Sequence, residues 1–590
     1  MFRAVLVANR GEIALRVLRA CRELGMATVA VYSEADRDAP WLRLADEAHL
    51  LGPAAPAQSY LNAERILEIA HRSGAEAIHP GYGFLAESAT FARAVVDSGL
   101  AWVGPPPGAI TAMGDKLSAR AAARSVHVPV VPGTMEPTDD PEVVRAFAAE
   151  HGLPVAIKAA FGGGGRGLKV VRAEPELVEA LESAKREAAA AFGRGEVYVE
   201  RYLARPRHIE IQVLADGDGT CLSLGERDCS TQRRHQKLIE ESPAPGFDPR
   251  ARRDMGAAAV RLAKAVGYTG AGTCEFLYEN DQFFFLEMNT RLQVEHPVTE
   301  LVTGLDLVQW QLRIAAGESL PFTQDDIVLR GHAIEARINA EHVARGFLPS
   351  PGRITAWRAP SGPGVRVDAG VEAGWEIPGA YDSLLAKLIT YGGDREDARR
   401  KMARALDEFV IEGVPTTIDF HRFALAQPDF VSGEVSTVTV EREWDLSAIP
   451  VAELPAPGGK GQRPSRTFTV EVDGKRLEVV LFESAGGSQA QSGMGTRSRR
   501  ERPRAGTGAS AGGPSGAELL APMQGTIVKT SVKPGATVAI GDLVLVLEAM
   551  KMENHIAAHR DGTVTTLHVA AGDVVNAGDI LATIDSEDAG

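Results

Sequence analysis

The sequence predicts a multidomain α/β protein that ends in a small all-β domain. Near the N-terminus, short apolar runs alternate with amphipathic helical stretches, which is the pattern of a parallel α/β layer. The middle of the chain combines strand-type segments with a glycine-rich loop and clustered charges. Near the C-terminus, a segment that starts at Gly525 repeats from Gly562, 37 residues later, and both copies alternate apolar with polar residues.

Size, charge and cysteine content narrow the class of protein. The chain has 590 residues, so we expect about three to five domains. A formal net charge of -15 argues against nucleic acid and anionic membranes as partners, and no apolar run reaches the roughly 18 residues of a membrane span. The N-terminus lacks the pattern of a signal peptide, and the four cysteines form no C-x-x-C pair. We therefore expect a cytoplasmic protein without disulfides or structural zinc.

Residues 1–113 form the first expected domain. The run AVLVAN predicts a strand, GEIALRVLRACRELG a helix, and TVAVYS a second strand. The helix start at NRGEIA could hold an anion, but the glycine pattern of a dinucleotide-binding loop is absent. A dinucleotide site is therefore not indicated.

Residues 114–315 contain the candidate nucleotide site. In VAIKAAFGGGGRGLKVV, a strand leads into four consecutive glycines and then into another strand. Such a loop lets backbone N–H groups approach phosphate oxygens, although an ordinary flexible hairpin fits the loop equally well. Lys116 and Lys158 add positive charge, and VYVERYL predicts a strand that runs into a linker beside a nucleotide base.

Two carboxylates give independent support for this site. The stretch GTCEFLYENDQFFFLEMNTR predicts a hairpin that turns at Asn280 and Asp281, which places Glu275 nearly opposite Glu287. Like charges that face each other across strands are destabilising unless a cation neutralises them. With Asn289 two residues further along the same face, the sequence predicts an all-oxygen site for Mg²⁺ or Mn²⁺.

The remaining segments are expected to be a third domain, a connection, a tether and a carrier. Residues 316–447 continue as strands followed by helices, and 448–483 include a possible hairpin that turns at Asp473–Gly474. Residues 484–516 are rich in Gly and Ser, so these 33 residues should be a flexible tether with a root-mean-square span of roughly 30 Å. Five arginines in the tether suggest an RNA-binding arm, but we interpret it as a solvated linker because no aromatic residues are interleaved with them.

Residues 517–586 contain the repeat and should form a flattened barrel or sandwich from two similar halves. Lys551 lies in the segment that joins the halves, between Met550 and Met552. A solvated lysine is the ordinary interpretation. Its position at the join and its flanking methionines favour a modification site on a surface that other proteins must contact.

The motif EAMKME on this small domain resembles the biotinyl domain of biotin-dependent carboxylases. Residues 1–447 resemble the biotin carboxylases of the ATP-grasp family. The matching stretches are ANRGEIA, HPGYGFLAE, MGDK, KAAFGGGGRG, RHIEIQVL, ERDCSTQRRHQK, LEMNTRLQVEHPVTE, HAIEARI and YDSLLAKL. The resemblance implies a Rossmann-like N-terminal domain, an ATP-grasp domain with a lid, an α+β C-terminal domain and a biotinyl barrel. The sequence departs from the family at Arg201, where lysine is common, and at Pro40–Trp41, where histidine is frequent.

The resemblance also implies roles for individual residues. Biotin would be attached to Lys551 and contacted by Tyr82 and Gly83. Glu295 would deprotonate bicarbonate, and Arg337 would stabilise the developing negative charge on the biotin oxygen. Bicarbonate would be bound by Lys237, Arg291, Gln293 and Val294. ATP would be bound by Lys116, Lys158, Gly162, Gly163, Gly164, Gly165, Glu200, Arg201, Leu203, His208, His235, Glu275 and Glu287. The metal ion would be bound by Glu275, Glu287 and Asn289.

The activity implied is ATP-dependent carboxylation of the chain's own biotin, by way of carboxyphosphate. Too few residues separate the carboxylase region from the biotinyl domain to hold a carboxyltransferase, so we expect that activity on a separate β subunit. A biotin protein ligase and other copies of the chain are the further expected partners. Two alternatives remain, namely another ATP-grasp ligase with a lipoyl-type carrier and a non-catalytic biotin carrier scaffold.

Overall fold

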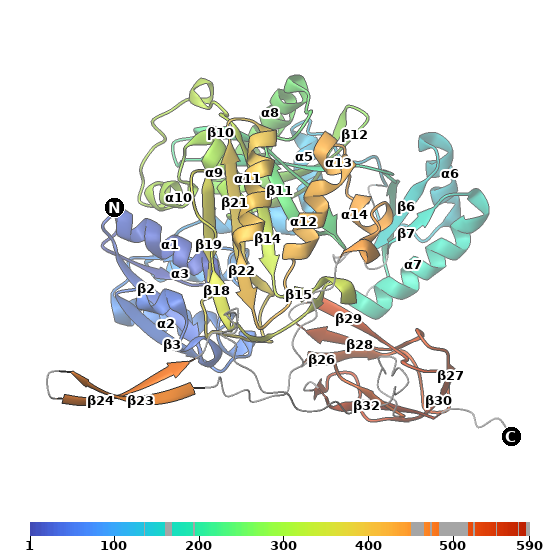
Figure 1. Cartoon of the computed structure of the whole chain (residues 1–590). Helices are drawn as coiled ribbons and strands as arrows, with labels where there is room; N and C mark the ends of the chain where they lie inside the picture. The colour runs from blue at the N-terminus through green and yellow to red at the C-terminus, as the bar shows by residue number, and fades with distance from the viewer. Residues whose placement is uncertain are drawn as a thin grey trace.

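The computed structural model describes residues 1–134, 136–159, 168–192, 195–449, 465–472, 475–482, 517–522, 525–549, 552–575 and 578–585 (Figure 1). The loop glycines Gly162 to Gly165, the tether and Lys551 lie outside the described residues. Within those ranges, no helix has both the length and the apolar character needed to cross a membrane.

A five-stranded parallel sheet forms the N-terminal part, in the order β3-β2-β1-β4-β5. Its strands are β1 (Ala4–Val7), β2 (Ala27–Ser33), β3 (Glu47–Gly52), β4 (Ala77–His79) and β5 (Ala101–Trp102), and its helices are α1 (Gly11–Glu23), α2 (Ala63–Ser73) and α3 (Ala89–Asp97). The predicted strands and the predicted helix are therefore present. A Cβ on Gly370 would come within 2.5 Å of the backbone nitrogen of Glu12. The backbone at Gly370 therefore covers the start of α1, which the sequence analysis considered as an anion site.

Eight antiparallel strands form the central sheet, in the order β13-β12-β9-β10-β11-β14-β21-β19. They are β9 (Arg207–Ala215), β10 (Cys221–Arg233), β11 (Gln236–Ser242), β12 (Gly270–Glu279), β13 (Gln282–Asn289), β14 (His332–Asn339), β19 (Val365–Ala369) and β21 (Leu384–Gly392). Because β11 pairs with β14, one sheet runs across the boundary expected between residues 315 and 316.

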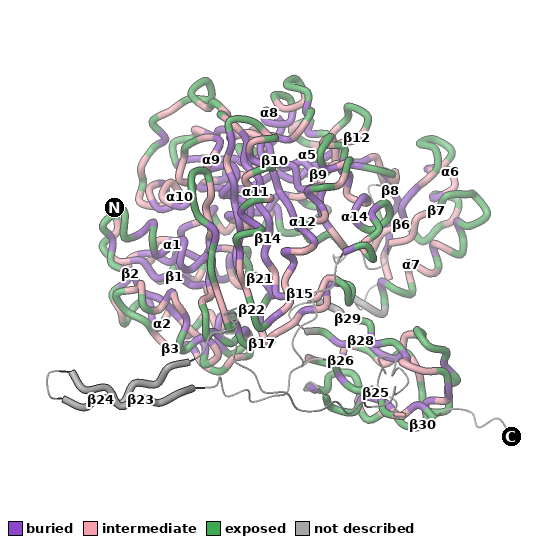
Figure 2. Tube along the Cα trace, in the orientation of Figure 1, coloured by how far each residue is buried: buried purple, intermediate pink, exposed green. Residues whose placement is uncertain are grey.

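Helices cover this sheet on both sides, and Figure 2 shows buried residues concentrated along its strands. Near β9, β12 and β13, buried alanines of α5 and Met255 of α8 pack against Ile209 and Phe276. Around β14 and β21, Met402 of α11 and Phe420 of α12 fill a second core. The helices are α4 (Pro107–Gly114), α5 (Lys116–Ser125), α8 (Pro249–Ala265), α9 (His296–Thr303), α10 (Leu307–Ala315), α11 (Arg395–Glu408), α12 (Ile418–Ala426), α13 (Pro428–Ser432) and α14 (Thr439–Arg442).

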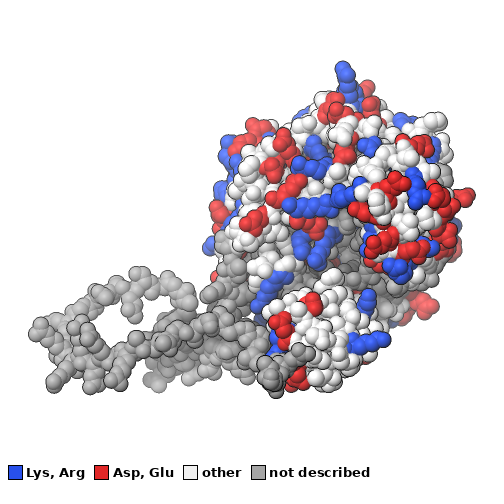
Figure 3. Space-filling model, turned by 90° about the vertical axis from the view of Figure 1, so that its right-hand side faces the viewer, with Lys and Arg blue, Asp and Glu red and all other residues white. Residues whose placement is uncertain are grey.

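A small lobe projects from the central body, at the right of Figure 1. Its three-stranded antiparallel sheet has β6 in the middle, and α7 and α6 close its own hydrophobic core. Its elements are α6 (Pro141–His151), β6 (Val155–Ala159), β7 (Lys169–Val171), α7 (Leu177–Phe192) and β8 (Val197–Arg201). Strands β6 and β7, which flank the glycine-rich segment in the sequence as predicted, are antiparallel neighbours. Acidic and basic side chains are interspersed on the face of the molecule shown in Figure 3.

Short strand pairs complete residues 1–449, which we call the carboxylase part after the activity expected for it, and a hairpin follows. The pairs are β15 (Glu341–His342) with β16 (Leu348–Pro349), β17 (Gly352–Arg353) with β20 (Glu376–Ile377), and β18 (Ala356–Arg358) with β22 (Val410–Glu412). The predicted hairpin is present as β23 (Ser465–Val472) and β24 (Lys475–Phe482), whereas its turn lies outside the described residues.

The C-terminal domain consists of two four-stranded antiparallel sheets, β25-β32-β30-β27 and β29-β28-β26-β31. The strands are β25 (Glu518–Leu520), β26 (Gly525–Thr530), β27 (Thr537–Val538), β28 (Leu543–Ala549), β29 (Met552–Ala557), β30 (Gly562–Leu567), β31 (Val574–Val575) and β32 (Ile580–Asp585). Each sheet takes strands from both halves of the repeat, and the two orders correspond strand for strand. Strand β28 ends at Ala549, which pairs with Met552 at the start of β29.

Candidate active site

Three glutamates lie side by side across the central sheet. Glu275 on β12 is directly opposite Glu287 on β13, as the hairpin pattern predicts. On its other side, Glu275 is opposite Glu210 on β9. The hairpin turns at Asn280 and Asp281, whose positive φ values of 52° and 57° suit these two residue types. A row of like charges at this density needs cations to neutralise it.

Lys237 supplies part of that positive charge. Its Nζ atom lies 3.0 Å from Glu275 Oε1 and 2.7 Å from Glu295 Oε1, and it also donates a hydrogen bond to Glu210. Burial disfavours the charged amine, but the three carboxylates outweigh burial and raise the pKa of Lys237 well above its usual value. Lys237 is therefore a fixed cation, and it joins the carboxylate row to Glu295.

Glu295 lies between two cations. Its other oxygen, Oε2, accepts a hydrogen bond of 2.8 Å from Arg337 Nη2, and Arg337 also donates to Glu240 through Nε. Burial favours the neutral acid, but Lys237, Arg337 and Arg227 outweigh burial and hold the pKa of Glu295 well below its usual value. Glu295 is therefore ionised at neutral pH, which is the form that accepts a proton.

The residues after β13 form a loop, residues 290–295, that packs against the carboxylates. Gln293 Nε2 donates to Glu275 Oε1 at 2.7 Å, and the fully buried Arg227 donates to the amide oxygen of Gln293. Arg291 binds Glu87 Oε2 at 2.9 Å through Nε and Asn289 Oδ1 at 2.8 Å through Nη2. We call this segment the bicarbonate loop, after the role expected for it. The structure thus brings Arg291, Gln293 and Glu295 to the same place as the carboxylates.

The predicted metal ligands fit a divalent cation. Burial and the charge of Glu275 raise the pKa of Glu287, so a nearby cation would favour its ionised form. Asn289 donates its amide to Glu275 Oε1 at 2.6 Å and so lies at the same position. Ligand atoms of His208, Glu210 and Glu275 also lie within 4.8 Å of one another. The carboxylate oxygens of this group are hard donors that suit Mg²⁺ or Mn²⁺, and His208 adds a nitrogen.

Glu210 is a site residue that the sequence analysis did not single out. It follows His208 by two residues on β9, so the two share a face, and His208 Nε2 lies 2.9 Å from Glu275 Oε2. The motif RHIEIQVL contains the signal, because an acidic residue alternates there with apolar ones. Its pairing with β12 over a long sequence separation could not be read from that alternation.

The residues predicted to bind ATP lie around the lobe and the carboxylate row. Glu200 on β8 forms an ion pair with Lys158 on β6 and accepts a 3.0 Å hydrogen bond from Arg120 Nη1. Leu203 packs with Val131 and Phe284 in a small buried apolar cluster. The other described members are Lys116 at the exposed start of α5, Arg201 at the end of β8, and His235 in the tight turn between β10 and β11.

The residues predicted to contact biotin form a turn after β4, residues 80–83, which we call the biotin turn. Asn9 Nδ2 donates to the carbonyl oxygens of Pro80 at 2.6 Å and Tyr82 at 2.7 Å, which fixes the turn. Gly83 has a φ of 68°, a conformation that favours glycine. The Tyr82 hydroxyl donates to Glu12 on α1.

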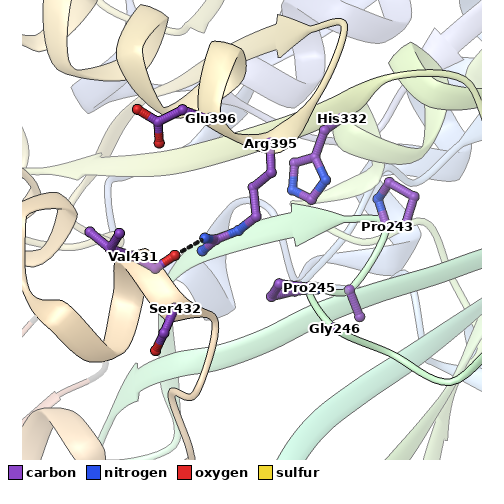
Figure 4. A pocket seen from close by; sticks show the side chains of 9 residues that line it. Pro243, Pro245, Gly246, His332, Arg395, Glu396, Val431 and Ser432 are labelled. Atoms are coloured by element: carbon purple, nitrogen blue, oxygen red, sulfur yellow. Dashed lines mark hydrogen bonds between the residues drawn. The ribbon is translucent and has the colours of Figure 1, made fainter.

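A separate hollow of about 380 Å³ lies beside α11 and α13 (Figure 4). Arg395 projects into it, but its guanidinium already binds Glu241 Oε2 at 2.6 Å and donates to the Phe430 and Val431 carbonyl oxygens. Glu241 follows Glu240 on β11, and consecutive strand residues point to opposite faces. This hollow is therefore on the other side of the sheet from Arg337, and we assign it no ligand.

Glu241→Gln is expected to lower the free energy of unfolding at pH 7 by about 3 kcal/mol. Burial favours the neutral acid, but His332 and Arg395 outweigh burial and lower the pKa of Glu241 to about 2. A depressed pKa stabilises the fold above the unfolded-state pKa near 4.5 and loses that contribution as pH falls towards 2. Denaturant unfolding of both proteins from pH 7 to pH 3 should thus show a difference that shrinks below pH 4.5.

The exposed Glu396 in the same hollow provides the control, since its ion pair with Arg399 is screened by solvent and Glu396→Gln should change stability far less than Glu241→Gln does. An E241Q difference that stays constant down to pH 3 would contradict the stabilising role of the ionised Glu241.

Comparisons with known proteins place the site in a wider context. Three family models match the carboxylase part: "Biotin carboxylase, N-terminal domain" at residues 1–110, "Carbamoyl-phosphate synthase L chain, ATP binding domain" at 115–323 and "Biotin carboxylase C-terminal domain" at 335–442. A fourth, "Biotin-requiring enzyme", matches residues 517–584. All four match in the order that the sequence analysis predicts.

Curated relatives and solved structures agree with these matches. The biotin-dependent acyl-coenzyme A carboxylase alpha3 subunit of Mycobacterium leprae is 51% identical over 98% of this chain and 98% of its own length. The biotin carboxylase of Pseudomonas aeruginosa is 52% identical over 76% of this chain and 99% of its own. The solved structure of the biotin carboxylase–beta-gamma-ATP complex of Campylobacter jejuni has a TM-score of 0.71 at 45% identity. The match covers 75% of this chain and 99% of that chain. A 2-oxoglutarate carboxylase domain of Hydrogenobacter thermophilus with MgADP and bicarbonate has a TM-score of 0.70 at 48% identity, covering 75% and 97%.

Proposed function

The chain belongs to the biotin-dependent acyl-CoA carboxylase α subunits, and we propose that the residues assembled above carry out its biotin carboxylase reaction. It is a ligase that uses ATP, Mg²⁺ and bicarbonate to carboxylate biotin on its own carrier domain, and a carboxyltransferase subunit receives the carboxyl group. The observation that carries the residue assignment is Glu295 between Lys237 and Arg337, next to the carboxylate row.

We assign to Glu295 the role of the base that removes the proton from bicarbonate. The carboxylate is ionised and lies beside Lys237, whose charge would also attract the bicarbonate anion. Arg291 offers a planar, forked donor for the same anion, and Gln293 and the Val294 N–H add hydrogen bonds from the bicarbonate loop. These groups would orient bicarbonate for attack on the γ-phosphorus of ATP.

Glu275, Glu287 and Asn289 would hold the divalent cation, which neutralises phosphate charge when bound. Lys116, Lys158, His208, His235 and the loop glycines Gly162 to Gly165 would hold the phosphates, with Glu200, Arg201 and Leu203 beside the base. Attached biotin supplies the ureido nitrogen that accepts the carboxyl group. Arg337 would bind the ureido oxygen while negative charge develops on it, and Tyr82 with Gly83 would position the ring.

Further proposals concern domains and partners. The domains are residues 1–113, 114–315, 316–447 and 517–586, joined by the segments 448–483 and 484–516. A biotin protein ligase would modify Lys551, several copies of the chain would assemble around the carboxyltransferase, and the complex would be cytoplasmic. The acyl-CoA acceptor would be acetyl-CoA or propionyl-CoA, and the carboxyltransferase subunit would select between them.

The purified chain is expected to hydrolyse ATP only with bicarbonate and a divalent cation present, and free biotin should accelerate the hydrolysis. A coupled assay for ADP, run with each component omitted in turn, measures this dependence. Mass spectrometry of the intact protein separates attached biotin from lipoate. Hydrolysis that does not depend on bicarbonate would support a different ATP-grasp ligase, and no hydrolysis would support a carrier scaffold.

A further inference from the structure

Two motifs of the sequence, ANRGEIA and YDSLLAKL, have no role in the reaction described above, and the fold brings them together. Glu12 comes from the first and Lys387 from the second, 375 positions later. We propose that Lys387 is a positioning residue that ties the bicarbonate loop to the biotin turn, so that the two substrates are aligned by one buried cation. This inference rests on the proposed function.

Lys387 lies on the second-to-last strand of the central sheet, beside the strand that carries Arg337 of the candidate active site. On β21 it is directly opposite Arg337 of β14 on one side and Asp368 of β19 on the other. Its side chain is 0% exposed. A buried ammonium group is strongly unfavourable unless its hydrogen-bonding and charge partners compensate. The partners of Lys387 therefore indicate why a charge is kept there.

The first partner belongs to the bicarbonate loop. Lys387 Nζ donates a 2.8 Å hydrogen bond to the carbonyl oxygen of Val294. That carbonyl shares a planar peptide unit with the backbone nitrogen of Glu295. The hydrogen bond thus fixes the orientation of the backbone at the start of the residue proposed as the base.

The second partner leads to the biotin turn. Lys387 Nζ lies 3.2 Å from Glu12 Oε1, and the same oxygen accepts the hydrogen bond of the Tyr82 hydroxyl. Glu12 is itself held in place, because the backbone at Gly370 lies against it too closely to admit a Cβ. Asp368, 3.9 Å from Lys387 Nζ, is already bound by Arg366 through two hydrogen bonds. Lys387 therefore connects Tyr82 to Val294 through a single carboxylate.

This arrangement gives Lys387 a role that charge balance alone would not. A cation needed only to neutralise Glu12 and Asp368 would not have to bind the Val294 carbonyl. A cation that holds both the loop and the turn makes the position of one depend on the other. Loss of Lys387 should then raise the KM values for both bicarbonate and biotin and leave the KM for ATP unchanged.

The test compares Lys387→Met with the unaltered chain in the bicarbonate-dependent ATP assay with free biotin. We expect the KM values for bicarbonate and for biotin each to rise about tenfold and the KM for ATP to stay within about twofold. Lys401→Met is the matched control, because Lys401 also binds a carbonyl and a carboxylate but lies on α11, away from the site. A purely structural role would lower Tm and the active fraction with all three KM values unchanged, and that result would overturn the proposal.

Tyr82→Phe keeps the test decisive if Lys387→Met does not fold, since it removes a single hydroxyl. It should raise the KM for bicarbonate as well as that for biotin, and its effect should be less than additive with Lys387→Met where both variants fold. An unchanged bicarbonate KM in Y82F would overturn the coupling. If the unaltered chain lacks bicarbonate-dependent ATP hydrolysis, the proposed function itself fails, which is a distinct outcome.

Discussion

Lys551→Arg is expected to abolish acyl-CoA carboxylation by the assembled enzyme and to leave carboxylation of free biotin intact. Arginine keeps the positive charge of the lysine but lacks the primary amine that forms the amide bond with biotin. Without attached biotin, no carboxyl group can reach the carboxyltransferase. The carboxylase residues are on the other part of the chain, so their reaction with free biotin does not depend on Lys551.

The measurement uses the chain together with its carboxyltransferase subunit and follows incorporation of labelled bicarbonate into acyl-CoA. We expect the rate to fall below the detection limit, a loss of at least about a thousandfold. Lys533→Arg is the control, because Lys533 is an exposed lysine on the same domain but lies outside the EAMKME motif. Retained acyl-CoA carboxylation in K551R, or a mass shift for biotin that persists in it, would contradict the assignment of Lys551.

The carrier domain shows what a repeat in the sequence can predict. The glycines at 535 and 572, and those at 541 and 578, have φ values between 90° and 97°, so each half needs glycine at the same two turns. Matching turns and matching alternation predict matching strands, and the two sheets correspond strand for strand. Local rules suffice here because each half is short. The exchange of strands between the sheets is a long-range property that the repeat alone does not reveal.

The active site shows where local rules end. Glu275 and Glu287 are 12 residues apart in one hairpin, so their pairing follows from turn position and strand alternation. Glu210 joins them by a pairing of β9 with β12 across a long connection, and no local pattern specifies that register. Lys387 and Glu12 come from opposite ends of the carboxylase part. Their meeting depends on how the N-terminal sheet packs against the central one.

Arg291 illustrates a third limit. The sequence analysis expected this residue in the bicarbonate site but did not predict which side chains it contacts. The sequence analysis assigned its fork to bicarbonate, whereas in the structure Nε binds Glu87 and Nη2 binds Asn289. Glu87 ends the motif HPGYGFLAE, in which the sequence analysis singled out Tyr82 and Gly83. A carboxylate that binds the arginine from across the site orients its fork, and such a partner is visible only once the domains are assembled.

Arg337→Ala is expected to lower kcat of the biotin-dependent reaction by about 10²- to 10³-fold, with little change in the KM for ATP. The guanidinium is the group placed to stabilise negative charge on the ureido oxygen, and it is held by Glu295 Oε2 at 2.8 Å and by Glu240. Bicarbonate-dependent ATP hydrolysis without biotin should fall less, because that half of the reaction does not develop charge on biotin. Steady-state assays with and without free biotin measure both rates.

Glu295→Ala should abolish both rates, because deprotonation of bicarbonate precedes either outcome. Arg337→Lys separates charge from geometry, since lysine keeps the cation but carries all of its N–H donors on one nitrogen, which cannot replace the rigid fork whose Nε and Nη2 reach Glu240 and Glu295 separately. We therefore expect Arg337→Lys to resemble Arg337→Ala in kcat. Arg330→Ala, an exposed arginine just before β14, should behave as the unaltered chain. Full activity in Arg337→Ala or Glu295→Ala would remove these residues from the mechanism and leave the observed ion pair as a purely structural contact.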